Sequence, residues 1–393
     1  MMAESSSPSF GEVVRASGVG AAFGVPDSLM KQALFALETE FGDREFTIAA
    51  NEGAAVGLAI GHHLATGQVP LVFMQNSGLG NALNPLISLA DSLVYSIPMI
   101  LLVGWRGELL GSGHQKADEP QHIKQGQVTI GQLELLGISS FVLESGSDLG
   151  RVFDQAMREA TNSSAPVAII VRSGTLLNPV GQQEPVESLY STREQIIGIV
   201  AEATGPRGAL CGLPVIATTG MASRELYENR RRGDGAGLEQ DFLTVGGMGH
   251  AVSIATAVAK AISPSKVVCL DGDGSVLMHM GALLHSAQQA NLIHVVLDNG
   301  VHDSVGGQPT GFRDIEVRGL SRSLGYHRYT RVENQEEMAA ALSKIRNLSG
   351  SVLIHAMCEP GHRSDLGRPE LTPLESKKRF MEFLTKLRNI PRA

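Results

Sequence analysis

The 393-residue sequence has few cysteines and few aromatic residues, and it contains no long hydrophobic run and no basic run. Its three cysteines are far apart and odd in number, which suits neither a disulfide framework nor a zinc site, so we expect a reducing cytoplasm. The net charge of −8 argues against a nucleic-acid-binding protein. The polar N-terminus has no apolar signal core, and Asp91 and Pro98 interrupt the longest apolar region, which argues against a membrane span.

Glycine, by contrast, is abundant at 45 residues, and a hydrophobic content of 43% is enough for two cores. Short β-prone runs alternate with segments of helical spacing, which predicts an α/β protein with doubly wound parallel sheets. The stretch Gly174–Thr192 loses this periodicity and collects Pro, Gly and Gln, as linkers do. We therefore predict an N-terminal domain over residues 1–178, a linker over 179–192 and a C-terminal domain over 193–393.

The clearest local signal is a βαβ unit in the second half. It comprises a strand, a tight acidic glycine turn, a helix and a second strand closed by Asn299-Gly300, namely Val267–Leu270, Asp271–Gly274, Ser275–Ala290 and Ile293–Asp298. Asp273 and Asn299, twenty-six positions apart, would lie side by side if the two strands are neighbours. Open α/β sheets bind ligands at this carboxyl edge. The oxygen ligands suit Mg²⁺, and the glycine backbone and helix N–H groups suit a diphosphate.

Three interpretations compete for this unit. It could be an ordinary βαβ turn with an acidic loop. A dinucleotide fingerprint requires a glycine where Leu277 stands, and the acidic loop would repel a pyrophosphate that carried no metal. The third is a thiamine diphosphate motif, which begins with GDG and ends in Asn, and which Gly272-Asp273-Gly274 to Asn299 resembles closely.

Further segments, in order along the chain, carry the same resemblance. They are GVPDS at 24–28, NEGAAVGLAIGHHLATG at 51–67, QNSGLGNALNP at 75–85, GWRGE at 104–108, DEPQHIKQG at 118–126, TTGMASREL at 218–226, TVGGMGHA at 244–251 and LDGDGSVLMHMG with DNGVHDSVGGQ within 270–308. Together they resemble the thiamine diphosphate-dependent decarboxylases, most closely those that act on phosphonopyruvate, with the sulfopyruvate decarboxylases as near relatives. The resemblance implies a pyrimidine-binding N-terminal domain and a diphosphate-binding C-terminal domain. The chain is too short for the central third domain of many members.

The resemblance assigns roles to residues that also have simpler explanations. Glu52 begins a helix, where an acidic residue favours the helix dipole, but it matches the glutamate that activates the cofactor's pyrimidine ring. Met248 could simply fill a core, but it matches the residue that props the cofactor into a bent shape. Asp27 could cap a helix, but it matches a proton donor or relay at the reacting carbon.

The remaining cofactor ligands follow from the same motifs. The expected cofactor-binding set is Glu52, Met248, Gly272, Asp273, Gly274, Ser275 and Asn299, and the expected Mg²⁺ ligands are Asp273, Asn299 and the Val301 carbonyl. The resemblance places the following loop near the substrate, with His302 as a catalytic candidate and the role of Asp303 left open.

Positive charge concentrates in the polar stretch from Arg106 to Gly126. It could be a solvated loop in which acidic neighbours balance the basic residues. It could instead be a lid or pocket for a dianionic phosphonate, which arginine binds through paired hydrogen bonds. Arg106 is the preferred ligand because it directly follows a buried strand, and His122 and Lys124 are further candidates, while His114 and Lys116 add to the charge.

The resemblance implies conversion of 3-phosphonopyruvate to phosphonoacetaldehyde and CO₂, with thiamine diphosphate and Mg²⁺, in phosphonate or antibiotic biosynthesis. Alternatives are decarboxylation of sulfopyruvate or another 2-oxo acid, and a non-catalytic regulatory subunit of the same fold. The joint presence of Glu52, Asp273 and Asn299 argues against that last alternative. The resemblance also implies a homodimer or homotetramer, whose cofactors lie between the N-terminal domain of one chain and the C-terminal domain of another.

Overall fold

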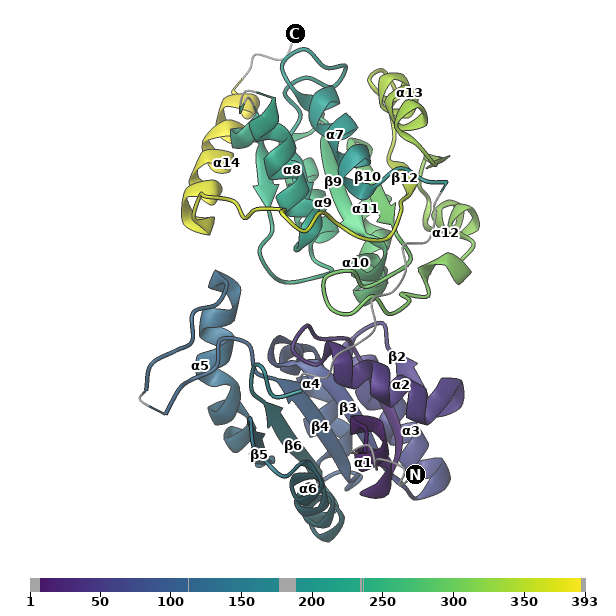
Figure 1. Cartoon of the computed structure of the whole chain (residues 1–393). Coiled ribbons are helices and arrows are strands. Elements are labelled where there is room, and N and C mark those ends of the chain that lie inside the picture. The colour runs from purple at the N-terminus through teal and green to yellow at the C-terminus, as the bar shows by residue number, and fades with distance from the viewer. Residues whose placement is uncertain (1–7, 112, 177–188, 234, 236, 390–393) are drawn as a thin grey trace, which may run out of the picture. The chain divides into compact units, whose positions relative to one another are not determined.

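The computed structural model describes residues 8–111, 113–176, 189–233, 235 and 237–389. The chain forms two compact units, each built around one parallel sheet (Figure 1). Most of the predicted linker, residues 179–188, lies outside the described residues. Within the described part of the chain, every helix is too short or too polar to span a membrane.

The first unit contains a six-stranded sheet in the order β2-β1-β3-β4-β6-β5, in which every pair of neighbours is parallel. The strands are β1 Val19–Gly24, β2 Phe46–Ile48, β3 Val69–Gln75, β4 Met99–Gly104, β5 Ser139–Leu143 and β6 Pro166–Val171. The central strands are buried along almost their whole length, as expected where helices cover both faces of a parallel sheet.

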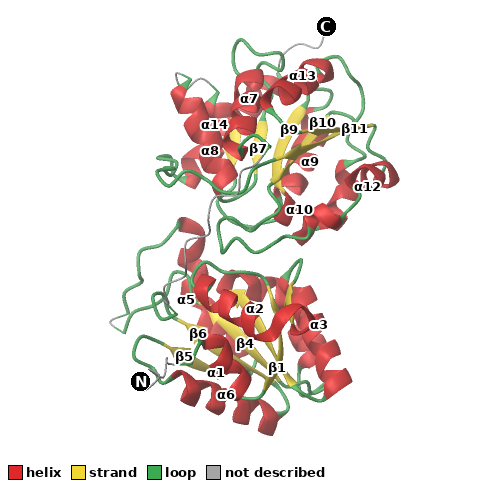
Figure 2. Cartoon of the chain, turned by 45° about the vertical axis from the view of Figure 1, so that its right-hand side comes forward, coloured by secondary structure: helices red, strands yellow, loops and turns green. Residues whose placement is uncertain are grey.

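Helices cover both faces of this first sheet (Figure 2). The helices of the first unit are α1 Phe10–Ala16, α2 Lys31–Glu45, α3 Glu52–Thr66, α4 Leu79–Pro85, α5 Pro120–Leu135 and α6 Leu149–Ser163. Apolar residues of α1, α2 and α6 form one core, and those of α3, α4 and α5 form the other. After β3 the chain forms a short 3₁₀ turn, Asn76–Gly78, that continues into α4.

The second unit has a parallel sheet in the order β11-β12-β10-β9-β7-β8. Its strands are β7 Val215–Ala217, β8 Asp241–Leu243, β9 Val267–Gly272, β10 Leu292–Asp298, β11 Arg328–Val332 and β12 Val352–Met357. Its helices are α7 Arg193–Thr204, α8 Met221–Arg232, α9 Ala251–Ile262, α10 Asp273–Met278, α11 Leu283–Ser286, α12 Val317–Leu324, α13 Gln335–Ile345 and α14 Pro373–Arg388. The predicted doubly wound α/β fold is confirmed in both units.

The two sheets share one strand order. When the strands of the second unit are counted from β7, its order is the same as that of the first unit. The sequence shows no clear internal repeat, so this shared topology is visible only in the structure. In both units the first four strands carry the candidate site residues in the loops that leave their carboxyl ends.

The βαβ unit differs from its prediction in one respect. Strands β9 and β10 are parallel neighbours, as the spacing of Asp273 and Asn299 requires. The single helix predicted over Ser275–Ala290 is wrong, because the segment contains the short helix α10, a 3₁₀ turn and the short helix α11. The break falls at His279, whose backbone leaves the helical region at φ −137° and ψ 48°. The ring of His279 packs against His250, with the ring centroids 4.5 Å apart, so a tertiary contact accompanies the break.

Candidate active site

Glu52 is the first residue of α3, after the loop that leaves β2. Asn51 caps the helix by accepting a hydrogen bond from the Ala54 backbone N–H. The Glu52 side chain is buried, and its Oε2 accepts a 2.8 Å hydrogen bond from Asn81 Nδ2. A Cβ atom at Gly78 would lie 2.5 Å from Glu52 Oε1, so only glycine leaves room for the carboxylate there. The carboxylate is therefore held in one position. A favourable interaction with the helix dipole alone would not require such tight placement.

Asp27 is fully buried in the loop after β1. Its Oδ1 accepts a 2.9 Å hydrogen bond from Gln75 Nε2, at the end of β3. Burial raises the pKa of Asp27, although the Gln75 hydrogen bond and the charge of Arg106 oppose the rise. Helix α2 begins at Lys31 with Met30 as its N-cap, so the interpretation of Asp27 as a helix cap is wrong. Its buried acid group is free of a capping role.

The Arg106 guanidinium is already paired. Its Nε and Nη2 donate hydrogen bonds of 2.8 Å and 2.5 Å to the two carboxylate oxygens of Asp118, and its Nη1 donates a 3.0 Å bond to Ser28 Oγ. Burial alone would raise the pKa of Asp118, but the hydrogen bonds and charge of Arg106 hold it well below its usual range. The cation that the sequence offers to a phosphonate is thus largely neutralised by Asp118.

The other basic residues of the polar stretch divide between loop and helix. The interpretation of the polar stretch as a loop is wrong at its end, because α5 begins at Pro120. His122 is buried on α5, and burial lowers its pKa, so the imidazole is neutral at neutral pH. Lys124 on the same helix is exposed. In the preceding loop, Lys116 lies 3.3 Å from Glu108. Of the three substrate candidates, His122 is thus buried, Arg106 is partly buried and Lys124 is exposed.

In the second unit, the hydroxyl of Ser275 joins three loops at the carboxyl edge of the sheet. Its Oγ accepts a 3.0 Å hydrogen bond from the Gly249 N–H and lies 3.0 Å from Thr218 Oγ1. Gly249 has φ +86°, and a Cβ atom there would lie 2.5 Å from His279 Cδ2, so glycine allows this close approach. The half-buried Met248 is carried by this loop, which follows β8.

Asp273 and the loop after β10 are connected directly, as the motif predicts. Asp273 is buried at the start of α10, and its Oδ2 accepts hydrogen bonds of 3.1 Å from the Gly300 N–H and 2.6 Å from Thr310 Oγ1. Burial raises the pKa of Asp273 to about 6. The Thr310 hydrogen bond opposes this rise, and the negative charge of Asp298 adds to it. A buried carboxylate of this kind gains from a bound cation, which would offset its lost hydration.

Asn299 follows β10, and its two amide atoms face different partners. Nδ2 donates a 2.6 Å hydrogen bond to Asp303 Oδ2, and Oδ1 accepts a 3.3 Å bond from the Val301 N–H. The His302 ring lies against Gly274, where a Cβ atom would be 2.9 Å from the ring. Burial lowers the pKa of His302 to about 4, so the imidazole is neutral at neutral pH.

These residues fit Mg²⁺ and a diphosphate in their donor chemistry. The Asp273 carboxylate, the Asn299 amide oxygen and the Val301 carbonyl are oxygen donors, which Mg²⁺ prefers. Gly272, which is partly exposed, has no side chain to screen its backbone from phosphate oxygens, whereas Gly274 is buried against the His302 ring. Sequence reasoning found these residues but missed Gln75 and Thr310, which contact Asp27 and Asp273. The position of Gln75 at a strand end is a usable signal, whereas no local pattern points to Thr310.

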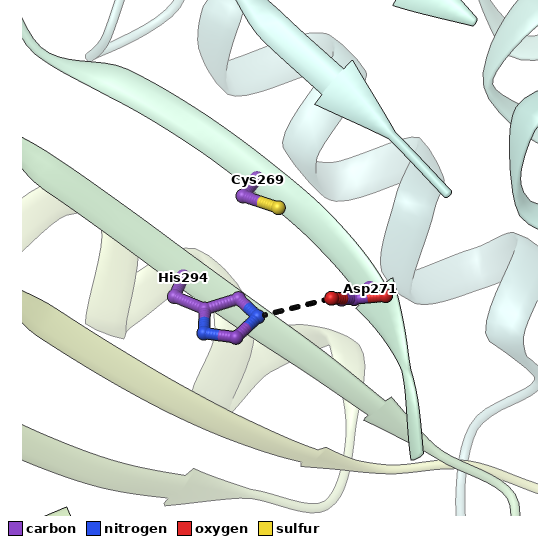
Figure 3. Close-up of side chains that lie close together, drawn as sticks. All are labelled: Cys269, Asp271 and His294. Carbon is purple, nitrogen blue, oxygen red and sulfur yellow. Dashed lines mark ion pairs between the residues drawn. The ribbon is translucent and has the colours of Figure 1, made fainter. Parts of the chain in front are cut away.

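A buried polar cluster lies behind the glycine turn, on β9 and β10 (Figure 3). Cys269, Asp271 and His294 are fully buried, and His294 Nε2 lies 3.5 Å from Asp271 Oδ2. The other ring nitrogen, Nδ1, lies 3.1 Å from the hydroxyl of Tyr326. Burial raises the pKa of Cys269 well above its ordinary value, so the thiol is uncharged. The cluster is thus part of the buried interior of the second unit.

Two family models match the chain. Residues 9–129 match the N-terminal TPP binding domain of thiamine pyrophosphate enzymes, and residues 237–356 match their C-terminal TPP binding domain. Glu52 lies in the first matched region, and Asp273 and Asn299 lie in the second.

Curated relatives cover almost the whole chain. The chain is 32% identical to the phosphonopyruvate decarboxylase of Streptomyces viridochromogenes, over 94% of this chain and 92% of the relative. It is 33% identical to the phosphonopyruvate decarboxylase of Streptomyces hygroscopicus, over 94% and 91% of the two chains. It is 27% identical to the sulfopyruvate decarboxylase of Methanosarcina acetivorans, over 95% and 96%.

Proposed function

We propose that this chain, which belongs to the thiamine pyrophosphate-dependent decarboxylases, converts 3-phosphonopyruvate to phosphonoacetaldehyde and CO₂. The observation that carries the substrate assignment is the similarity to two phosphonopyruvate decarboxylases along more than nine-tenths of the chain. The presence of Glu52, Asp273 and Asn299 in well-defined buried positions supports a working catalytic site.

Thiamine diphosphate, when bound, supplies the electron sink that accepts the electron pair left behind when the bond to CO₂ breaks. In this proposal Glu52 would hydrogen-bond the pyrimidine ring of the cofactor, and Met248 would support the cofactor. Asp273, Asn299 and the Val301 carbonyl would hold Mg²⁺. Gly272, Gly274 and Ser275 line the turn that faces the diphosphate.

Asp27 and His302 are the proposed proton-handling groups. Asp27 is suited to donate a proton because burial raises its pKa and keeps its carboxyl protonated to higher pH than that of an exposed aspartate. Burial lowers the pKa of His302 to about 4, so its neutral ring is suited to donate or accept a hydrogen bond rather than to carry a positive charge.

The substrate residues in this proposal are Arg106, His122 and Lys124. A guanidinium has five N–H donors, and the bonds to Asp118 and Ser28 use three of the donors of Arg106. Two donors are therefore available for a phosphonate while the ion pair with Asp118 is intact. A dianionic group would gain more from Arg106 if Asp118 moved away.

Two other candidate functions remain, and one of them has a specific observation in its favour. Decarboxylation of sulfopyruvate is supported by the similarity to the Methanosarcina acetivorans protein. A sulfonate has one charge less than a phosphonate dianion, and the neutralised Arg106–Asp118 pair would suit a less charged group. A regulatory subunit of the same fold is the remaining alternative, and loss of one residue of the Glu52, Asp273 and Asn299 set would have favoured it.

The proposal includes a place and a partner. We place the enzyme in phosphonate or antibiotic biosynthesis in a reducing cytoplasm, where its free cysteines would stay reduced. We propose a homodimer or homotetramer with cofactor sites shared between chains. The Gly- and Ala-rich sequence of α3 allows close packing of another helix.

The test is a comparison of three substrates with the purified chain, thiamine diphosphate and Mg²⁺. Release of CO₂ is measured from 3-phosphonopyruvate, sulfopyruvate and pyruvate, with the Glu52→Gln variant as the inactive control. We expect the highest kcat/KM for 3-phosphonopyruvate and little turnover of pyruvate, because binding energy of the remote phosphonate is needed at the reacting carbon. A higher kcat/KM for sulfopyruvate would replace the proposed substrate, and no turnover of any 2-oxo acid would favour the regulatory subunit.

A further inference from the structure

We propose that Asp303 and Arg193 are positioning residues that aim the amide oxygen of Asn299 at the metal. This inference rests on the proposed function, in which Asn299 is a Mg²⁺ ligand. The carboxyl of Asp303 accepts the Asn299 amide hydrogen, and the buried guanidinium of Arg193 fixes that carboxyl in place.

The orientation of an asparagine ligand matters because its two ends are chemically opposite. The amide oxygen binds a cation, whereas the NH₂ group repels it. An ionised carboxylate accepts hydrogen bonds and cannot donate them. The 2.6 Å contact with Asp303 therefore selects the NH₂ end of Asn299. The oxygen end of Asn299 is thereby directed away from Asp303, toward the backbone N–H of Val301.

Two segments distant in sequence hold the carboxyl of Asp303. Arg193, the first residue of α7, donates a 2.7 Å hydrogen bond from Nη1 to Asp303 Oδ2. The backbone N–H of Gly361, between β12 and α14, donates a 3.0 Å bond to Asp303 Oδ1. Both oxygens therefore have donors from other segments, and the side chain cannot turn without breaking them.

Arg193 is itself anchored from the opposite side. Its Nε and Nη2 donate 2.9 Å hydrogen bonds to the two carboxylate oxygens of Glu225 on α8, and its side chain is only 8% exposed. Burial alone would lower the pKa of Arg193, but the charges and hydrogen bonds of Glu225 and Asp303 raise it, so the guanidinium is charged. A planar fork bound on two edges is rigid, which a lysine in the same place could not reproduce.

The charges of this network also favour a cation nearby. Glu225 and Asp303 carry two negative charges and Arg193 carries one positive charge, so the buried group has a net charge of −1. A Mg²⁺ ion held by Asn299 would lie beside that negative charge. Residues that orient a metal ligand typically contribute about 10-fold to 100-fold to metal affinity.

The experiment measures metal binding directly, without activity. Mn²⁺ replaces Mg²⁺, and the free Mn²⁺ is followed by electron paramagnetic resonance in the presence of thiamine diphosphate. For Asp303→Asn we expect Mn²⁺ affinity to fall by about 10-fold to 100-fold, because the new amide can face Asn299 with either end. For Arg193→Lys we expect a smaller loss in the same direction. This second variant keeps a positive charge at the buried position. If Asp303→Asn does not fold, Mn²⁺ binding by Arg193→Lys still tests the positioning role.

The matched control is Arg363→Gln. Arg363 also joins α7 and α8 through carboxylates, Glu194 and Glu228, but it lies outside the network around Asp303. We expect this control to bind Mn²⁺ like the wild type even if its unfolding temperature falls. Decarboxylation by Asp303→Asn should recover most of the wild-type kcat at saturating metal, since the lesion concerns affinity, whereas general loss of structure would not recover.

Three outcomes separate the inference from the proposed function. If Asp273→Ala loses Mn²⁺ binding and Asp303→Asn binds like the wild type, the positioning role is overturned and the proposed metal site stands. If the wild type with thiamine diphosphate binds no Mn²⁺, or if Asp273→Ala binds it normally, the metal site and the positioning role both fail. A loss in both variants, with Arg363→Gln unaffected, supports the positioning role.

Discussion

Gln75 Nε2 donates a 2.9 Å hydrogen bond to Oδ1 of Asp27, whereas Oδ2 of the same buried carboxyl has no hydrogen-bond partner among the described residues. Gly104 allows this arrangement, because a Cβ atom there would lie 1.9 Å from Oδ2. A buried carboxyl with one oxygen unpaired is poorly stabilised as an anion. Burial accordingly raises the pKa of Asp27.

The first prediction concerns the proton on Asp27. Asp27→Asn keeps the size of the side chain and the contact with Gln75 but removes the proton that the acid can donate. We expect decarboxylation to slow by about 10²-fold to 10⁴-fold, the usual contribution of a general acid. Thiamine diphosphate binding, measured by calorimetry, should stay within about threefold of the wild type, and turnover equal to that of the wild type would contradict the role.

The same residue predicts a pH dependence of stability. An exposed aspartate in the unfolded chain ionises near pH 4, whereas the raised pKa keeps Asp27 protonated in the folded chain. Wild-type stability should therefore decline, relative to Asp27→Asn, as pH rises from about 4 toward the native pKa of Asp27. Urea unfolding of both proteins at about pH 4 and about pH 7.5 measures this. If the difference in free energy of unfolding between the two proteins were the same at both pH values, the pKa of Asp27 would not be raised by folding.

The second prediction concerns the metal loop. Asp273→Ala removes a proposed Mg²⁺ ligand and the acceptor for Gly300 and Thr310. We expect thiamine diphosphate affinity in the presence of Mg²⁺ to fall by more than about 100-fold, which exceeds the usual loss from an outer-shell partner. Calorimetry measures the affinity, circular dichroism checks the fold, and the exposed Asp314→Ala serves as the control. Unchanged cofactor affinity in Asp273→Ala would remove the assignment.

The third prediction uses the Arg106–Asp118 pair to test the substrate site. If Arg106 binds the phosphonate, Arg106→Ala should lower the ratio of kcat/KM for 3-phosphonopyruvate to that for pyruvate by about 10-fold to 100-fold. Asp118→Ala should raise this ratio, because it removes the carboxylate that competes for the guanidinium. Lys116→Ala, in the same loop, is the control. A ratio that does not respond to Arg106→Ala would place the phosphonate elsewhere.

The fourth prediction tests sharing of sites between chains. One chain carries Glu52→Gln and another carries Asp273→Ala, so each is inactive alone. In a mixed dimer with shared sites, one site has both lesions and the other pairs native Glu52 with native Asp273. Mixed dimers isolated through two different tags should recover up to about half of the wild-type activity. If each site were formed within one chain, every site would keep a lesion and no activity would return.

The fifth prediction concerns the cluster behind the glycine turn. Ser286 Oγ donates to the Leu283 carbonyl and lies 2.5 Å from the Tyr326 hydroxyl, so that hydroxyl donates to Ser286 and accepts from Nδ1 of His294. The other ring nitrogen, Nε2, lies 3.5 Å from Asp271 Oδ2. His294 therefore connects the Tyr326 hydroxyl to the buried carboxyl of Asp271.

Removing the imidazole leaves the buried groups that it contacts without a polar partner. We expect His294→Gln to lower the free energy of unfolding by about 1–3 kcal/mol. The exposed His327→Gln should change it by less than about 0.5 kcal/mol. Urea unfolding measures both variants, and equal, small effects would mean that the cluster contributes little to stability.

Much of the fold could be predicted from short-range patterns. Apolar runs located β9 and β10 to within a few residues, because strands covered on both faces need continuous hydrophobic sequence. The parallel pairing of β9 and β10 was predictable because a βαβ connection returns the chain in the same direction. The predicted helix over 275–290 failed, because its spacing is helical while the non-helical backbone at His279 accompanies a contact with His250, far away in the sequence.

The sequence by itself determined which side chains stand at the strand ends, because a strand and the residue after it are consecutive in the chain. Glu52, Asp273 and Asn299 were identifiable in this way. Only the tertiary structure decided what these side chains contact. Arg106 meets Asp118 across a loop, and Asn299 reaches Arg193 through Asp303, across a separation of 110 residues between the last two. Such contacts depend on how distant segments pack, which no local spacing encodes.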